Sequence, residues 1–130
     1  MPKINHYEDI TKLNLEAKKD YIDRHSAFVS APSEVKAGEV FQVTVTVGKE
    51  YTHPDDLDHY IASMSLFSGE TLLAKADFMA GMLGGQGHKG HATATFHILA
   101  KGKKMKLVAH AYCTKHGIWE SEPVEVAITE

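Results

Sequence analysis

The alternation of apolar and polar residues is the feature of this sequence that most restricts its fold. The segment "VFQVTVTVG" alternates strictly, and its apolar side chains are Phe41, Val43, Val45 and Val47. Successive side chains of a β-strand point to opposite faces, so this pattern indicates a half-buried strand that ends at Gly48.

Further segments with strand-like patterns follow along most of the chain. They occupy residues 60–67, 71–79, 92–99, 104–113 and 124–129, with a shorter one near 27–31. In 104–113 the predicted inward face consists of Met105, Leu107, Ala109, Ala111 and Cys113. No helical pattern separates these segments, which predicts an all-β fold: an immunoglobulin-like antiparallel β-sandwich. With a single cysteine the immunoglobulin disulfide is absent, so the expected likeness is one of architecture.

Ahead of the sandwich we expect a short N-terminal helical segment. Between Tyr7 and Tyr21 apolar positions recur at helical spacing and charges fill the gaps, as in an amphipathic helix or helical turn. A chain of 130 residues is long enough to bury the core of one domain. The predicted organisation is a helical segment over 1–22 and one β-sandwich domain over 23–130.

Charge and composition restrict the classes of partner. The formal net charge of -3 gives no basis for general binding to nucleic acid or to a membrane surface. No apolar run approaches the length of a membrane span, and the N-terminus "MPKINHYEDITKL" lacks the apolar core of a signal peptide. Together with the single cysteine, these features predict a cytoplasmic protein.

The only cysteine, Cys113, stands three residues before His116 in "AYCTKHGIWES". A thiolate and an imidazole at this spacing, on a turn that Gly117 allows, can reach the same metal ion. The pattern is weak by itself, because a lone cysteine is commonly buried as a small apolar residue.

Histidine is unusually frequent, with nine copies in the chain. The stretch "EYTHPDDLDHY" carries His53 and His59 in a loop that follows the strand ending at Gly48, and Pro54 stiffens the chain beside the first of them. Two solvated histidines on a polar loop are the alternative interpretation. A third signal is His25, where the helical region passes into the first strand. In a sandwich these segments can meet at one end.

Three blocks of the sequence stand out when they are read together. They are "DRHSAFV", "VGKEYTHPDDLDHYIA" and "AYCTKHGIWESE", and they span about residues 23–122. In this order they resemble the superoxide reductases of the single-domain neelaredoxin type, the desulfoferrodoxin iron-binding family. We expect no cysteine-rich domain of the desulfoferrodoxin kind, since one cysteine cannot supply it.

The resemblance implies one mononuclear iron that passes between Fe2+ and Fe3+. The implied ligands are four equatorial imidazoles and one axial thiolate, from His25, His53, His59, His116 and Cys113. Such a set suits iron and leaves a sixth position for a small substrate. The implied activity is that of a superoxide reductase, in which Fe(II) gives one electron to superoxide and hydrogen peroxide forms without release of dioxygen.

The sequence departs from the family pattern just before the first histidine. The usual glutamate and lysine are replaced here by Asp23 and Arg24. Aspartate is one methylene shorter than glutamate, so we expect it to reach less far toward ferric iron. Arg24 keeps a positive charge that attracts superoxide, but it does not release a proton usefully. Lys49, in "VGKE", is a second candidate cation, and we expect protons to arrive through bound water.

The resemblance also implies rubredoxin or a similar small protein as electron donor, and a homotetramer. Two other classes of function remain as alternatives. A cupredoxin-like electron carrier would share the sandwich and the C-x-x-H turn, but no methionine follows His116 and four histidines exceed the need of blue copper. A plain adhesion or assembly module would leave the clustered histidines unexplained.

The remaining histidines receive structural interpretations. His88 and His91 in "GGQGHKGH" have H-x-x-H spacing, but this glycine-rich stretch is expected to be a mobile surface loop. His97 and His110 lie in predicted strands and are expected to face solvent. Trp119 is expected to pack beneath the turn that follows the cysteine.

Overall fold

The structure is a computed structural model that describes residues 19–130 of the chain. Within this range one short helix, α1 (Lys19–His25), precedes nine strands. The strands are β1 (Ala27–Ser30), β2 (Glu34–Lys36), β3 (Val40–Val47), β4 (Ile61–Ser68), β5 (Thr71–Asp77), β6 (Thr93–Leu99), β7 (Lys104–Cys113), β8 (Gly117–Glu120) and β9 (Val124–Thr129).

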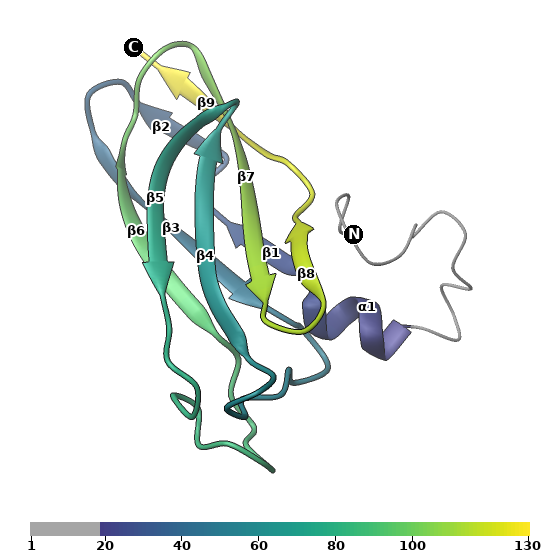
Figure 1. The fold of residues 1–130 in the computed structure, drawn as a ribbon. Helices are drawn as coiled ribbons and strands as arrows, with labels where there is room; N and C mark the ends of the chain where they lie inside the picture. Colours follow the sequence, from purple (N-terminus) through teal and green to yellow (C-terminus); the bar gives the residue numbers. More distant parts are fainter. Residues whose placement is uncertain (1–18) are drawn as a thin grey trace.

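The strands form two sheets that pack face to face as a β-sandwich (Figure 1). One sheet has the order β1-β3-β6, and the other has the order β2-β9-β7-β4-β5 with β8 paired to β7. The strand pairs are antiparallel except β2 and β9, which run parallel at one edge. The predicted all-β sandwich is confirmed, with this one parallel pair as an addition.

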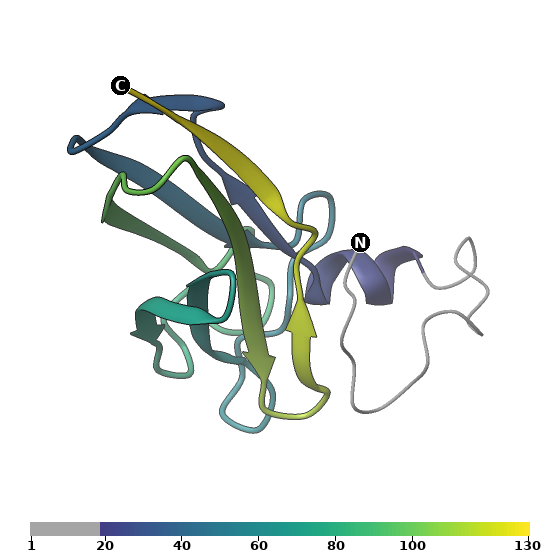
Figure 2. The same ribbon diagram turned by 90° about the horizontal axis from the view of Figure 1, so that it is seen from above.

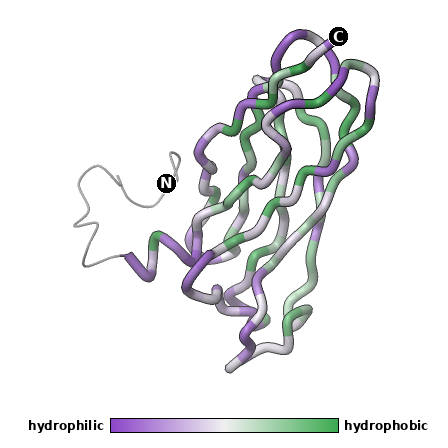
Figure 3. Tube along the Cα trace, turned by 180° about the vertical axis from the view of Figure 1, so that it is seen from behind, coloured by the Kyte–Doolittle hydropathy of each residue, from purple (hydrophilic) through white to green (hydrophobic). Residues whose placement is uncertain are grey.

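The core lies between the two sheets and is built from the alternating faces of the strands. The four apolar side chains that alternate along β3 are buried, and so are the five predicted inward residues of β7, which include Cys113. Figure 3 shows apolar positions recurring between polar ones along the strands. Burial of a Val, Leu, Phe or Met side chain contributes about 1.5–3 kcal/mol, so burial of these faces selects the register of the sheets.

Two short strands have no counterpart in the predicted pattern. β2 spans three residues, of which only Val35 is buried, and β8 spans four. Runs this short contain too few residues to display a clear alternation. β8 nevertheless matters for the site, because it pairs with the end of β7 at Cys113.

The helix differs in extent from the expectation. Most of the predicted helix over 7–21 falls on residues 7–18, which lie outside the described residues. α1 covers the end of that prediction and continues through His25. Within residues 19–130, no helix is long and apolar enough to cross a lipid bilayer.

Three segments that are distant in sequence come together at one end of the sandwich. They are α1, the loop between β3 and β4, and the turn between β7 and β8 (Figures 1 and 2). The backbone N–H of Gly48 donates to Ser26 O at 2.9 Å, and that of Thr114 donates to Tyr60 O at 3.0 Å. These bonds join the ends of all three segments.

Candidate metal centre

Four histidine rings form a closed square where these segments meet. Neighbouring ring centroids are 4.8, 4.7, 4.9 and 4.8 Å apart in the order His25, His53, His59, His116 and back to His25. Neighbouring planes are inclined by 82°, 81°, 68° and 84°. Across the diagonal, His25 and His59 are 6.3 Å apart with planes only 25° from parallel. The rings are therefore arranged around a common centre and do not form a stack.

The donor atoms of these rings meet the cysteine sulfur. His25 Nε2 lies 3.1 Å from His116 Nδ1, and His53 Nε2 lies 3.2 Å from Cys113 Sγ. One donor atom from each of His25, His59, Cys113 and His116 lies within 4.8 Å of the others. Metal–ligand bonds of about 2.0–2.3 Å place the donors of one ion about 3–4.5 Å apart. The spacing of these four donors is close to that range, and His53 lies outside the group but approaches its sulfur.

The turn after β7 supplies the sulfur and one imidazole. Cys113 is the last residue of β7 and is completely buried. The backbone N–H of His116 donates to its sulfur at 3.3 Å, and Gly117, at a φ of 80°, leads the chain into β8. Residues with a Cβ are strained at such a φ, so the glycine allows the tight C-x-x-H turn.

The loop between β3 and β4 carries two more candidate ligands, His53 and His59. Asp56 and His59 exchange two backbone hydrogen bonds, of 3.0 and 2.9 Å, which close a tight turn that presents His59. His53 stands at the start of this loop and is buried. The proline that follows it fixes one backbone angle and limits the freedom of the loop at that point.

Hydrogen bonds to backbone carbonyls orient two of the rings. His25 Nδ1–H donates to Tyr21 O at 2.6 Å, and His53 Nδ1–H donates to Pro54 O at 2.6 Å. A carbonyl oxygen only accepts, so Nδ1 carries the proton and each Nε2 keeps its lone pair for the cluster. Metal-binding histidines are commonly fixed in this way.

Trp119 closes the inner side of the cluster. It is completely buried, and its ring lies nearly parallel to that of His25, at 4.9 Å and 16°. Its Nε1–H donates to His116 O at 3.1 Å. The prediction that Trp119 packs beneath the cysteine's turn is confirmed.

Burial favours the uncharged form of three of the imidazoles, those of His25, His53 and His59. Removal from water lowers the pKa of His25 to about 3 and the pKa of His53 to about 4. Burial, followed by repulsion from His116, also lowers the pKa of His59. Burial raises the pKa of the Cys113 thiol, so a thiolate there needs a nearby cation. Neutral imidazoles and a thiolate are the forms that bind metals, and metal binding releases the thiol proton.

One atom of the cluster lacks any other partner. Among the described residues, His59 Nε2 is buried without a hydrogen bond. A buried polar atom left unpaired costs about 1–3 kcal/mol, and a metal ion in the square would remove that cost. Imidazole nitrogen and thiolate sulfur are donors that bind iron as well as zinc and copper, so the residues present are compatible with iron.

Comparison with known proteins gives the family of this chain. The family model described as desulfoferrodoxin matches residues 15–122. This chain belongs to the desulfoferrodoxin family. The match covers all five candidate ligands, and it confirms the resemblance that the three sequence blocks indicate.

Individual members of the desulfoferrodoxin family are similar over most of the chain. The superoxide reductase of Pyrococcus abyssi is 37% identical over 91 residues, covering 67% of this chain and 76% of that protein. The neelaredoxin of Megalodesulfovibrio gigas is 31% identical over 111 residues, covering 76% of this chain and 84% of that protein. A solved structure of the superoxide reductase (neelaredoxin) from Ignicoccus hospitalis has a TM-score of 0.68 at 26% identity, covering 91% of this chain and 89% of that chain.

In this member of the desulfoferrodoxin family, the carboxylate of Asp23 is hydrogen-bonded to the backbone at the start of the loop between β3 and β4. The carboxylate accepts the backbone N–H groups of Lys49 at 3.1 Å, Glu50 at 3.0 Å and Tyr51 at 2.8 Å. These bonds tie α1 to the start of the loop that carries His53. The carboxylate therefore has a structural task that is separate from the histidine cluster.

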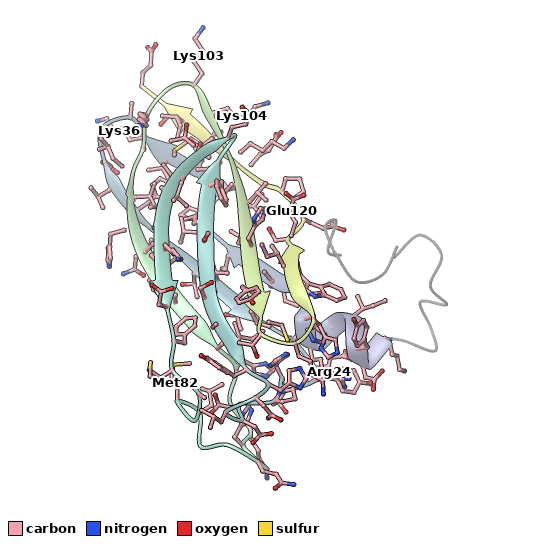
Figure 4. All side chains as sticks on the ribbon, viewed as in Figure 1. Arg24, Lys36, Met82, Lys103, Lys104 and Glu120 are labelled. Atoms are coloured by element: carbon pink, nitrogen blue, oxygen red, sulfur yellow. The ribbon has the colours of Figure 1, made fainter. Side chains whose placement is uncertain are left out.

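The two cations named from the sequence have different surroundings. Figure 4 places Arg24 on α1 at the cluster end of the molecule. Burial dominates the lowered pKa of His25 and of His53, and the Arg24 charge contributes to both shifts. The exposed Lys49 instead holds its ammonium 5.9 Å from the ring centroid of Phe28.

Lys115 is a further cation at the site that the sequence pattern does not single out. It lies inside the C-x-x-H turn and is exposed. After burial and His116, its charge is the next cause of the lowered pKa of His59. Its place between two candidate ligands was the available signal in the sequence.

The other histidines that the structure describes bond to backbone carbonyls, contact a carboxylate or face solvent. His88 Nε2–H donates to His53 O at 2.6 Å, and His91 Nδ1–H donates to Val47 O at 3.1 Å, so the glycine-rich segment is bound to its neighbours. His97 is exposed, as predicted. His110 is half-buried and lies 3.1 Å from a carboxylate oxygen of Glu120 on β8.

Proposed function

We propose that this protein is a superoxide reductase, which gives one electron to superoxide, forms hydrogen peroxide and releases no dioxygen. The observation that carries this proposal is the square of four imidazoles beside one buried cysteine sulfur in a desulfoferrodoxin-family chain. Relatives that cover most of the chain are named superoxide reductase and neelaredoxin. Family membership favours this activity over the cupredoxin-like carrier.

The proposed cofactor is a single iron, with His25, His53, His59, His116 and Cys113 as its ligands. When bound, the iron supplies the electron as it passes from Fe2+ to Fe3+, and a thiolate ligand favours that oxidation. The protein holds His25 and His53 neutral by burial and fixes both rings through Nδ1–H bonds to carbonyls.

A small anion can approach the cluster from the surface. His59 and His116 are half-buried, whereas His25 is completely buried, so the square has an inner and an outer side. Arg24 and Lys115 bring positive charge to this end, and superoxide is an anion that such charge attracts. Two protons are needed for hydrogen peroxide. We propose that they arrive through water, because arginine does not release its proton.

The partners and location proposed here rest on the family resemblance. We propose rubredoxin or a similar small redox protein as the donor that returns the metal to Fe2+, and a homotetramer in the cytoplasm. Analytical ultracentrifugation of the purified protein tests the tetramer. Stopped-flow mixing of oxidised protein with reduced rubredoxin tests the donor, and a rate that does not depend on rubredoxin concentration would contradict it.

The decisive experiment combines metal analysis with the stoichiometry of the reaction. We expect one iron per chain, one ferric centre formed per superoxide consumed, and no dioxygen in an oxygen electrode when reduced protein meets superoxide. A dismutase returns half of its superoxide as dioxygen, because one superoxide is oxidised for each one reduced. Dioxygen release in that ratio contradicts the reductase, and native copper in place of iron would favour the cupredoxin-like alternative.

A further inference from the structure

We propose that His88 is a positioning residue for His53 and thereby sets the sulfur side of the metal centre. The inference rests on the proposed iron site and extends it to a residue that is not a ligand. His88 lies in the glycine-rich segment 78–92 between β5 and β6, 35 residues along the chain from the histidine that it contacts. Its ring nitrogen approaches His53 O to 2.6 Å.

The hydrogen bonds of His88 define which of its nitrogens carries the proton. The backbone N–H of Gly90 donates to His88 Nδ1 at 3.2 Å, so Nδ1 is an acceptor without a proton. The ring proton is therefore on Nε2, which donates to His53 O. A single neutral tautomer satisfies both bonds, so the imidazole holds the segment and His53 together at the same time.

The carbonyl that His88 holds belongs to a candidate ligand whose ring has a bond of its own. The ring of His53 donates from Nδ1 to Pro54 O at 2.6 Å and places Nε2 3.2 Å from Cys113 Sγ. The bond from His88 fixes the main chain of this residue, while the bond to Pro54 fixes its ring. Ligand distances in a metal site tolerate deviations of only about 0.2 Å, so a small shift of the main chain disturbs the contact with the metal.

The glycine-rich segment has its own attachment, which does not depend on His88. The buried carboxylate of Asp55 accepts the backbone N–H groups of Leu83 at 2.7 Å and Gly85 at 3.2 Å. The backbone N–H of Gly81 donates to Asp55 O at 3.0 Å. Loss of the His88 side chain therefore leaves the segment attached through Asp55, and it removes the bond to His53 O together with the bond from Gly90 N–H.

Two substitutions separate the two bonds of the His88 ring. His88→Gln carries an amide N–H near the position of Nε2, so it can still donate to His53 O. His88→Asn carries its polar atoms near the position of Nδ1, so it can accept from Gly90 but does not reach His53 O. His91→Ala is the matched control, because it removes a bond of the same segment to Val47 O.

The test uses iron-loaded protein and two readouts other than activity. They are the rate of iron loss to a chelator and the energy of the thiolate-to-ferric-iron absorption band. We expect His88→Ala and His88→Asn to lose iron about 10-fold faster than wild type, the size seen for residues that orient metal ligands. The band should shift in the same two variants. His88→Gln and His91→Ala should stay close to wild type in both readouts.

Several results would overturn the proposal. One is a His88→Asn variant with wild-type iron retention and an unshifted band. Another is wild-type iron retention in His88→Asn but not in His88→Gln, which would mean that the bond from Gly90, and not the bond to His53, retains the iron. An equally fast loss in His91→Ala would mean general loosening. If the alanine variant does not fold, as judged by circular dichroism, the Gln and Asn pair still decides. A wild-type protein that binds no iron would overturn the proposed function and this inference together.

Discussion

Cys113 shows how burial and metal binding depend on each other at a single residue. Its sulfur accepts the backbone N–H of His116 at 3.3 Å and lies 3.2 Å from His53 Nε2. Burial raises the pKa of its thiol, which opposes formation of the thiolate in the metal-free protein. A metal cation supplies the stabilisation that water gives elsewhere, so metal binding and loss of the thiol proton occur as one event.

The first prediction concerns this sulfur. Cys113→Ser should abolish the thiolate-to-iron absorption of the oxidised protein and weaken iron binding by at least about 10-fold, because a serine hydroxyl stays protonated and donates poorly to iron. Visible absorption and iron content after dialysis measure both effects. His97→Ala, at an exposed strand position, is the control and should change neither. A serine variant that retains colour and iron would exclude the sulfur as a ligand.

The second prediction concerns Asp23. Asp23→Ala removes the acceptor of three backbone N–H groups, two of them exposed to water, so the free energy of unfolding should fall by about 0.5–1.5 kcal/mol. The ferric absorption spectrum should stay unchanged, since the carboxylate bonds to the backbone of the loop and not to the metal. Asp20→Ala, on the same helix, is the control and should cost less, because Asp20 makes only a 3.5 Å contact with Arg24. Urea unfolding measures the cost; a changed spectrum without destabilisation would mean that Asp23 is a ligand.

At the scale of elements, the long strands could be predicted from the sequence and the short ones could not. β3 and β7 alternate over enough residues to reveal one buried face, whereas β2 and β8 are too short for this signal. The meeting of α1 with two loops follows from the family motifs and not from periodicity. The contact of Asp23 with backbone 26 to 28 residues away has no local sequence signal, because it depends on how the elements pack.

The third prediction concerns the turn between β7 and β8. Gly117 has a φ of 80° and Gly102, in the turn between β6 and β7, has a φ of 78°. Alanine at either position should lower the free energy of unfolding by about 1–2 kcal/mol, since a Cβ is strained there. Only Gly117→Ala should also speed iron loss to a chelator, because its turn joins Cys113 and His116 to β8. Equal rates of iron loss in both variants would mean that the turn between β7 and β8 has no special role in retaining the metal.

At the scale of the whole molecule, the buried histidines make folding of the iron-free protein sensitive to pH. This is the fourth prediction. The pKa of His25 is lowered to about 3 and the pKa of His53 to about 4, while in the unfolded chain both titrate near 6.5. Below about pH 6.5 the unfolded state therefore binds more protons than the folded state. As the pH is lowered, the free energy of unfolding decreases by up to about 1.4 kcal/mol per pH unit for each histidine.

Urea unfolding of the iron-free protein at several pH values between 7.5 and 5 measures this loss, in a range above the titration of most carboxylates. Stability should be greatest near the upper end and decrease steadily below about 6.5. His97→Gln removes an exposed histidine and should leave the slope unchanged. An iron-free protein that is equally stable at both ends of the range would contradict neutral burial of His25 and His53.

The last prediction follows from the distribution of charge over the molecule. The net charge of -3 repels superoxide, so an attractive field must be local. Figure 4 places Arg24 at the cluster end and Lys103 at the opposite end of the sandwich. If superoxide is steered by the local field, its second-order rate should fall as salt rises, because the Debye length is about 10 Å at 0.1 M.

Arg24→Ala should lower the rate by about 3- to 10-fold at low salt and flatten its salt dependence, whereas Arg24→Lys and the far-end control Lys103→Ala should preserve both. Stopped-flow kinetics across salt concentrations decides, and equal losses in Arg24→Ala and Lys103→Ala would mean that total charge, and not its position, governs the encounter.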